Sequence, residues 1–157
     1  MRNIIILTDT RQQKEEHILK EFDKHDIMHI RTTLKSADYM AIEIKENKPI
    51  ADFTILIDTK KDIEEIAHNV CNSQEHERIK REIERARELG CKDFIFLICS
   101  NTVKNSNDLE KWKSTRTKVQ GKVLMKIMKT MKERYGCRFI FIPKKECGKK
   151  IIELLQK

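Results

Sequence analysis

The stretch 51–60 constrains the fold of this chain more than any other. Residues 55–57 (Ile-Leu-Ile) are continuously apolar, which is typical of a strand buried on both faces in the middle of a sheet. Asp58 and Lys60 follow at the end of that strand. Residues two apart in a strand project from the same face. The sequence therefore predicts an acid and a lysine side by side where a central strand leaves the core.

The rest of the chain alternates between strand and helix patterns. Apolar, β-branched runs bounded by turn residues predict further strands at 3–8, 27–33, 39–45, 93–99 and 138–142. Apolar residues at helical spacing predict helices at 12–26, 61–71, 75–89, 118–135 and 144–156. The segment 100–114 reads as a polar loop. This order predicts one α/β domain over residues 1–157, with a mixed central sheet flanked by helices on both faces.

The strands 39–45 and 51–58 read as an antiparallel hairpin across the turn residues 46–49. Opposed residues in a hairpin have a constant sum of residue numbers. A turn centred on Lys48 gives a sum of 96 and sets Asp38 opposite Asp58, with Cβ atoms roughly 5 Å apart. Pairing of the apolar faces favours a sum of 97 instead. A β-bulge near one strand end would reconcile the two registers, so the pattern predicts an acid pair that can share a metal.

The charge is unevenly distributed along the 157 residues, which carry a net +8. Residues 104–157 hold 16 Lys and Arg against 5 Asp and Glu, whereas residues 1–103 hold 17 against 20. An acidic half beside a basic half suits a polyanionic substrate that is cut with a metal, although a merely soluble basic protein gives the same balance. Arg116, Lys118 and Lys122, where the helix 118–135 begins, are the cations most suited to nucleic-acid phosphates.

The five cysteines contain no C-x-x-C pair of the kind that binds zinc. The N-terminal residues read as a strand rather than a signal peptide, and no apolar window approaches the roughly 18 residues of a membrane span. An odd number of cysteines without a secretion signal predicts reduced thiols in a cytoplasmic protein that has no membrane partner.

Three ordered motifs resemble the XPF-type nuclease domain, a branch of the PD-(D/E)xK superfamily. The stretch 9–12 resembles the D-x-R-E of that family, 37–39 its G-D-Y, and 58–64 its E-R-K-x-x-x-D. The resemblance covers nearly the whole chain without a helicase or helix-hairpin-helix part. That small size resembles the single-domain versions carried by phages and mobile elements.

The resemblance implies a restriction-endonuclease-like fold and a metal-dependent DNA endonuclease that acts on branched or flap DNA. Asp38 and Asp58 would bind Mg²⁺ or Mn²⁺, and Lys60 would position the attacking water. The resemblance further implies supporting roles for the acids Asp9 and Glu64 and a phosphate contact for Arg11. It also implies a homodimer formed through the C-terminal helices, whose apolar residues are numerous.

Two other functions stay open at this stage. Gln12, Ala37 and Thr59 stand where the family has Glu, Gly and Arg, which favours a degenerate member that only binds DNA or a protein partner. Asp9, Asp58 and Lys104 are also arranged in sequence like the phospho-acceptor pocket of a signalling receiver domain. The predicted hairpin argues against the receiver, because that fold has a helix in its place.

Overall fold

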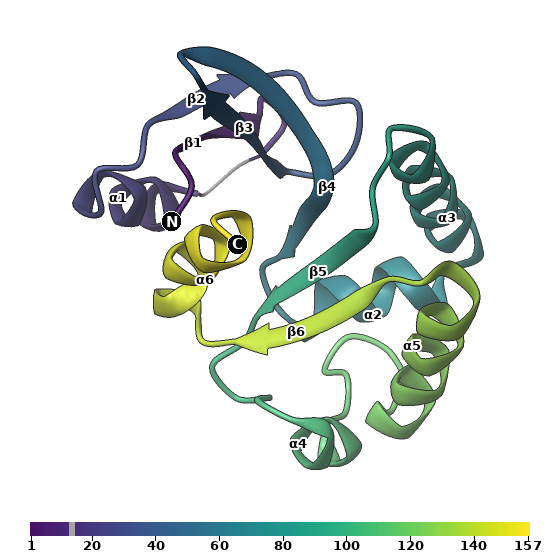
Figure 1. The fold of residues 1–157 in the computed structure, drawn as a ribbon. Helices are drawn as coiled ribbons and strands as arrows, with labels where there is room; N and C mark the ends of the chain where they lie inside the picture. Colours follow the sequence, from purple (N-terminus) through teal and green to yellow (C-terminus); the bar gives the residue numbers. More distant parts are fainter. Residues whose placement is uncertain (13–14) are drawn as a thin grey trace.

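Six strands form one mixed sheet in the order β2-β1-β3-β4-β5-β6 (Figure 1). The structure is a computed structural model that describes residues 1–12 and 15–157. The strands are β1 (Ile4–Asp9), β2 (His29–Thr32), β3 (Tyr39–Lys45), β4 (Lys48–Lys60), β5 (Asp93–Cys99) and β6 (Arg138–Ile142). β3 runs antiparallel to both β1 and β4, and the other neighbouring pairs are parallel. The predicted mixed sheet is therefore confirmed.

Helices cover both faces of this sheet (Figure 1). On one face lie α1 (Glu16–Lys24) and α6 (Cys147–Leu155), the latter preceded by a short 3₁₀ turn, η1 (Lys144–Glu146). On the other face lie α2 (Ile63–Cys71), α3 (Ser73–Glu88), α4 (Ser106–Lys111) and α5 (Gly121–Tyr135). β5 separates the two cores by alternation, since Phe94, Phe96 and Ile98 enter one core while Ile95 and Leu97 enter the other.

The β3–β4 hairpin contains the predicted bulge but turns earlier than predicted. Glu46 and Asn47 form the turn with positive φ angles of 50° and 63°, so Lys45 pairs with Lys48 and the paired numbers sum to 93. A register shift between Tyr39 and Ala41 brings the sum to 96 at the pair Tyr39–Ile57. The turn lies earlier than predicted because Lys48 is already the first residue of β4, paired with Lys45. The register at the acid end is nevertheless the one that sets Asp38 opposite Asp58.

Two parts of the C-terminal half differ from the sequence prediction. The predicted loop 100–114 contains α4, and Asn105 caps it by accepting a hydrogen bond from the Asp108 N–H. The apolar residues of the predicted helix 118–135 are not all in the core: Val123 is 50% exposed, because α5 buries the adjacent stripe of Leu124, Met128 and Met131. The exposed side of α5 is thus partly apolar.

The helix α6 uses its apolar residues within its own chain. Ile151, Ile152, Leu154 and Leu155 are all buried, against α1 and the sheet. The Arg2 side chain donates to the Leu155 carbonyl oxygen at 2.6 Å, which ties the two ends of the chain together. Of the two helices predicted to form a dimer, α6 therefore has no apolar side chain left for a second chain.

The prediction that all cysteines are reduced is wrong for one pair. Cys99 at the end of β5 and Cys147 at the start of α6 form a disulfide, while Cys71, Cys91 and Cys137 are free. The pair is 48 residues apart in sequence and meets only because β6 returns the chain to the same end of the sheet.

Within residues 1–12 and 15–157, no helix has the length and apolar character needed to cross a bilayer.

Candidate active site

The bulge in β3–β4 fixes two acids next to each other. The Asp38 N–H donates to the Ile57 carbonyl at 2.9 Å, and the Asp38 carbonyl accepts from the Asp9 N–H at 2.9 Å, so this backbone is held on both sides. Asp58 follows Ile57 and is only 6% exposed. Burial, together with the charge of Asp58, raises the pKa of Asp38 well above its usual range. The two carboxyl groups therefore repel each other when both are ionised.

Lys60 completes this cluster from the same face of β4. Its Nζ lies 3.0 Å from Asp58 Oδ2, and its side chain is 12% exposed. Burial alone would lower the pKa of Lys60, but the charges of Asp58, Glu65 and Asp38 raise it overall. Lys60 is therefore a protonated ammonium that can donate hydrogen bonds but cannot act as a base.

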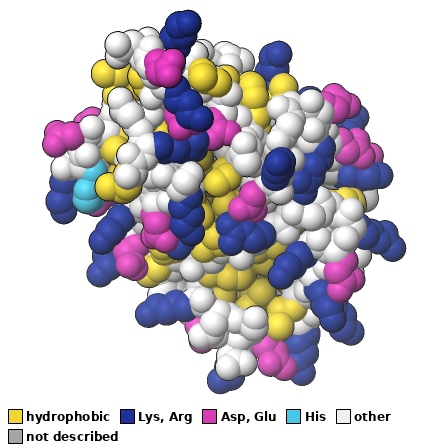
Figure 2. Space-filling view, viewed as in Figure 1, with side chains coloured by type: hydrophobic (Ala, Val, Ile, Leu, Met, Phe, Trp, Pro, Cys, Tyr) yellow, Lys and Arg dark blue, Asp and Glu magenta, His cyan; other side chains and the backbone are white. Residues whose placement is uncertain are grey.

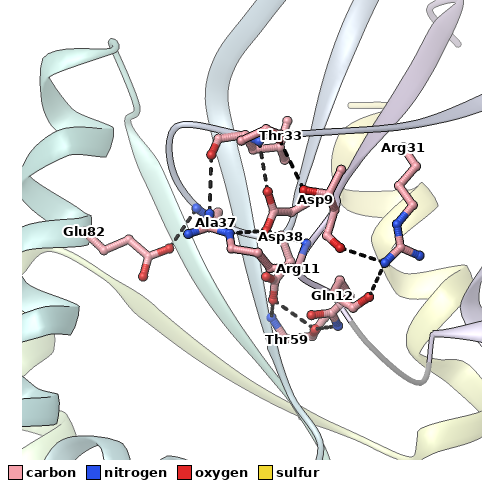
Figure 3. A network of polar contacts seen from close by, with 11 residues as sticks. Asp9, Arg11, Gln12, Arg31, Thr33, Ala37, Asp38, Thr59 and Glu82 are labelled. Atoms are coloured by element: carbon pink, nitrogen blue, oxygen red, sulfur yellow. Dashed lines mark hydrogen bonds and ion pairs between the residues drawn. The ribbon is translucent and has the colours of Figure 1, made fainter.

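A third acid, Glu82 of α3, faces the same cluster and was missed by sequence reasoning. Its Oε1 accepts a hydrogen bond from the Ala37 N–H at 2.8 Å, and Ala37 adopts a positive φ of 64° (Figure 3). Burial and the charge of Asp58 raise the pKa of Glu82. A signal was present in the sequence, because Glu82 is three residues after Ile79 and four before Ala86, within the apolar stripe of its helix.

A hydrogen-bond chain holds Asp38 from the other side (Figure 3). Gln12 Nε2 donates to Thr59 Oγ1 at 2.6 Å. Thr59 then donates twice to Asp38 Oδ2, from its N–H at 2.8 Å and from its hydroxyl at 3.1 Å. Gln12 and Thr59, two of the three residues that depart from the family motifs, thus act together. They hold Oδ2 of Asp38, while Oδ1 of that carboxylate accepts no hydrogen bond from residues 1–12 or 15–157.

Asp9 and Arg11 lie beside the cluster with separate tasks. Asp9 is 1% exposed and accepts from the Leu34 N–H at 2.9 Å and from Arg11 Nε at 2.7 Å. Burial favours a higher pKa for Asp9, but these hydrogen bonds hold its pKa below the usual value. Asp9 is thereby occupied in fixing the 33–34 loop. The Arg11 side chain is 71% exposed and feels the charges of Glu82 and Asp38, so it can reach a phosphate near the acids.

The structure does not bring Glu64 to the acid cluster. Its carboxylate accepts hydrogen bonds from Ser114 Oγ and from the Thr115 N–H, both at 2.7 Å. Glu64 therefore fastens the loop before α5 to α2. The predicted DNA contacts Arg116, Lys118 and Lys122 are exposed on that loop and on the first turn of α5.

The carboxyl pair suits a small divalent cation. In the described part of the chain, no three His, Cys, Asp or Glu side chains gather closely enough to bind a metal alone. Mg²⁺ needs only one or two carboxylates, because it keeps several waters and takes substrate phosphate oxygens. The repulsion between Asp38 and Asp58 is a strain that a divalent cation would relieve. These residues fit Mg²⁺ or Mn²⁺ in composition and charge.

The mixed sheet with acids at a bulged central hairpin defines the class as a restriction-endonuclease-like fold. Among solved structures, XPF from Aeropyrum pernix is similar with a TM-score of 0.67 and 14% sequence identity; the match covers 96% of this chain and 64% of that one. The family model described as the ERCC4 domain matches residues 8–155. The chain therefore belongs to the ERCC4 domain family. No curated protein sequence matches this chain.

Proposed function

We propose that the protein is a metal-dependent DNA endonuclease that hydrolyses phosphodiester bonds in branched or flap DNA. The observation that carries the proposal is the meeting of Asp38, Asp58 and Lys60 at the β3–β4 bulge. Two coupled carboxylates beside a buried ammonium form the constellation that phosphodiester hydrolysis with a metal requires. Membership in a nuclease family supports the same reaction.

The side chains divide the chemistry among themselves. Asp38 and Asp58 would hold Mg²⁺ or Mn²⁺, which when bound supplies Lewis acidity and lowers the pKa of water. Lys60 is protonated and held by Asp58, so it orients the attacking water by donating a hydrogen bond and adds positive charge where the phosphate becomes more negative. Arg11 supplies an exposed guanidinium for a flanking phosphate.

Gln12 and Thr59, which in sequence favour a degenerate member, make contacts that support activity. Gln12 removes a carboxylate, yet its amide orients the Thr59 hydroxyl that holds Asp38. The supporting contacts around Asp38 are therefore complete. The receiver alternative has lost its basis, because a β-hairpin occupies residues 39–60 where the receiver fold has a helix.

DNA affinity would come from the basic surface of α5 and the loop before it. Figure 2 shows Lys and Arg side chains along the side of the molecule where α5 lies. The cations of this basic surface are exposed and lie on one face of α5 and on the loop before it: Arg116, Lys118, Lys122, Lys126, Lys129 and Lys132. Such cations position a duplex through its phosphates without reading its sequence.

The proposal includes a homodimer formed through α5. A cavity of about 560 Å³ between α4, α5 and β6 is lined by four apolar residues together with three lysines of the basic surface, Lys122, Lys126 and Lys129. The apolar residues are Leu109, Met125, Met128 and Phe141. Figure 2 shows hydrophobic side chains gathered on this part of the surface, below β6. Val123 adds a half-exposed apolar side chain to α5. Light scattering at tens of micromolar protein should give twice the 18.7 kDa of one chain, and a mass of 18.7 kDa would contradict the dimer.

The direct test is cleavage of defined DNA. The purified protein is incubated with a flap, a branched junction and an intact duplex of the same sequence, each with Mn²⁺ or with a chelator. We expect cuts near the branch in Mn²⁺, little cutting of the duplex, and none with the chelator. Binding of all substrates without any cut would leave the degenerate member as the function.

A further inference from the structure

A groove runs from the acid cluster across the carboxyl ends of β4 and β5. Two cavities form it, of about 550 and 230 Å³, and both are lined by Lys61, Asp62, Cys99 and Lys144. The larger one also reaches Thr59 and Lys60 of the acid cluster. The smaller one extends to Trp112, the single tryptophan of the chain. The groove therefore connects the catalytic lysine to a partly exposed aromatic ring.

The charge of this groove is suited to an anionic chain. The three acids of its lining are Asp62, Glu64 and Glu65. Glu64 accepts hydrogen bonds from Ser114 and Thr115. Asp62 accepts from the Glu65 N–H at 2.8 Å, and Glu65 accepts from the Lys61 N–H at 3.2 Å. Both contacts stabilise the start of α2. The Lys61 and Lys144 side chains are exposed and form no ion pair among residues 1–12 and 15–157. The lining of the two cavities thus holds four cations, Arg11, Lys60, Lys61 and Lys144, against these three acids.

Trp112 is held in place by its surroundings. The Gly121 N–H donates to the Trp112 carbonyl at 2.7 Å, and a Cβ at position 121 would lie 1.6 Å from the Leu109 carbonyl oxygen, so only glycine permits this approach. Glu64 fastens the following residues, Ser114 and Thr115, to α2. These contacts fix the backbone around Trp112, and its side chain packs against the core. An aromatic ring beside exposed lysines can bind unstacked bases and their phosphates.

The inner wall of the groove adds a polar ring. His17 lines the larger cavity, and its Nε2 is buried without a hydrogen-bond partner in the part of the chain that the structure describes. Burial and the charge of Lys144 lower the pKa of His17, which favours the neutral ring, and a neutral imidazole has one donor and one acceptor nitrogen. A nucleobase offers both kinds of partner.

We propose that this groove binds the unpaired DNA strand of the substrate next to the scissile phosphate. A base stacks on Trp112, and the phosphates contact Lys61 and Lys144. Cavities of about 550 and 230 Å³ accommodate one or a few nucleotides but not a duplex. The inference rests on the proposed nuclease function and names its substrate: a branch whose single strand leaves the acid cluster along the groove.

Fluorescence of Trp112 tests the proposal without metal or cleavage. A dT₈ oligonucleotide is titrated into the protein in a chelator at low salt. We expect saturable quenching of the single tryptophan, with an affinity that falls as salt rises. Unchanged fluorescence at full occupancy, judged by the anisotropy of labelled dT₈, would overturn the stacking on Trp112.

Variants distinguish binding of DNA in the groove from attraction of DNA to the net positive charge of the protein. The double variant K61A/K144A should bind labelled dT₈ with a salt slope lower by about 1.4, or about 0.7 for each phosphate that a lysine no longer neutralises. The matched control K48A/K92A removes two exposed lysines at the opposite end of β4 and β5 and should keep the parent slope. W112L should weaken binding about tenfold, and W112F, which keeps a ring in the core contact, should lose less. Equal losses in K61A/K144A and K48A/K92A would overturn the proposal.

Cleavage assays keep this inference separate from the nuclease proposal. If dT₈ quenches Trp112 but no substrate is cut in Mn²⁺, the groove stands and the nuclease activity fails. If flaps are cut equally by the parent and by K61A/K144A, the activity stands and the groove fails.

Discussion

The acid cluster at the β3–β4 bulge and the lysine surface of α5 hold charge in opposite ways. Asp58 and Lys60 are almost fully buried and paired at 3.0 Å, and Thr59 holds Asp38 with two hydrogen bonds. The α5 lysines are exposed, and among the described residues they form no ion pair. The acid cluster fixes the position of a few atoms, whereas the lysine surface of α5 supplies only a positive electrostatic potential.

This difference indicates which function each region can support. Buried side chains that hydrogen-bond to one another have a defined geometry, and their environment shifts pKa values. Both properties are typical of catalytic sites. Exposed lysines on a helix can follow any phosphate backbone, which provides affinity without specificity. Substitutions in the two regions should therefore differ in size and in the quantity that changes.

Asp58→Asn should have the largest effect. The substitution removes one negative charge from the carboxyl pair and should lower cleavage by about a thousandfold or more, because the cation loses a ligand. Flap cleavage in Mn²⁺ at saturating DNA measures it, and circular dichroism checks that the fold is kept. The matched variant Asp52→Asn, far along β4, should cut normally. Cleavage by Asp58→Asn near the parent rate would remove this residue from the mechanism.

Lys60→Ala should lower the cleavage rate by about a hundredfold or more, while DNA affinity stays near that of the parent. The physical reason is that its buried ammonium acts at one place in the reaction, unlike the lysines of α5. Single-turnover rates and anisotropy separate the two quantities. A variant that binds DNA poorly but cuts at the parent rate would place Lys60 with the α5 surface instead.

The triple variant R116A/K118A/K122A tests the other side of the comparison. DNA affinity should fall on the order of tenfold, and the salt slope should drop by about 0.9 for each phosphate that these cations no longer neutralise. The cleavage rate at saturating DNA should change little. The control variant K20A/K24A/K92A removes three exposed lysines elsewhere and should leave the slope unchanged. An unchanged slope in the first variant would show that this surface does not bind DNA.

Asp38→Asn should have the smallest effect on the metal-free protein, and it should be stabilising. Burial and Asp58 raise the pKa of Asp38 in the folded state, so its ionisation costs stability as pH rises above its unfolded value of about 4. Asparagine removes that cost while its carbonyl can still accept from Thr59. We expect a melting temperature about 3 °C above that of the parent at pH 7, with the gap closing near pH 4. A gap independent of pH would contradict the assigned cause.

Much of the fold could be predicted from local patterns. The strands β5 and β6 have the bounds read from their apolar runs, because each run is short and ends at turn residues. The pairing of Asp38 with Asp58 could also be predicted from the sequence. It depends only on the hairpin register near Asp38, which a β-bulge sets. These features depend on residues close together in the chain.

The features that sequence reasoning missed depend on distant contacts. Glu82 meets Ala37 across 45 residues, and Gln12 meets Thr59 across 47. The disulfide joining Cys99 to Cys147 likewise needs the crossover through β6. The spacing of Glu82 indicates that it lies in the apolar stripe of α3, but not that this stripe meets the acid pair. Glu64, which the sequence predicts to support the acids, binds the loop before α5 instead.

Calorimetric titration of Mn²⁺ tests the central claim most directly, because it reports the carboxyl pair without DNA or turnover. The parent protein and Lys60→Ala should each bind Mn²⁺, whereas Asp38→Asn and Asp58→Asn should lose that binding. Variants of the exposed α5 surface should titrate as the parent does. Mn²⁺ binding that survives in Asp58→Asn with unchanged affinity would contradict the claim that the β3–β4 bulge is the metal site.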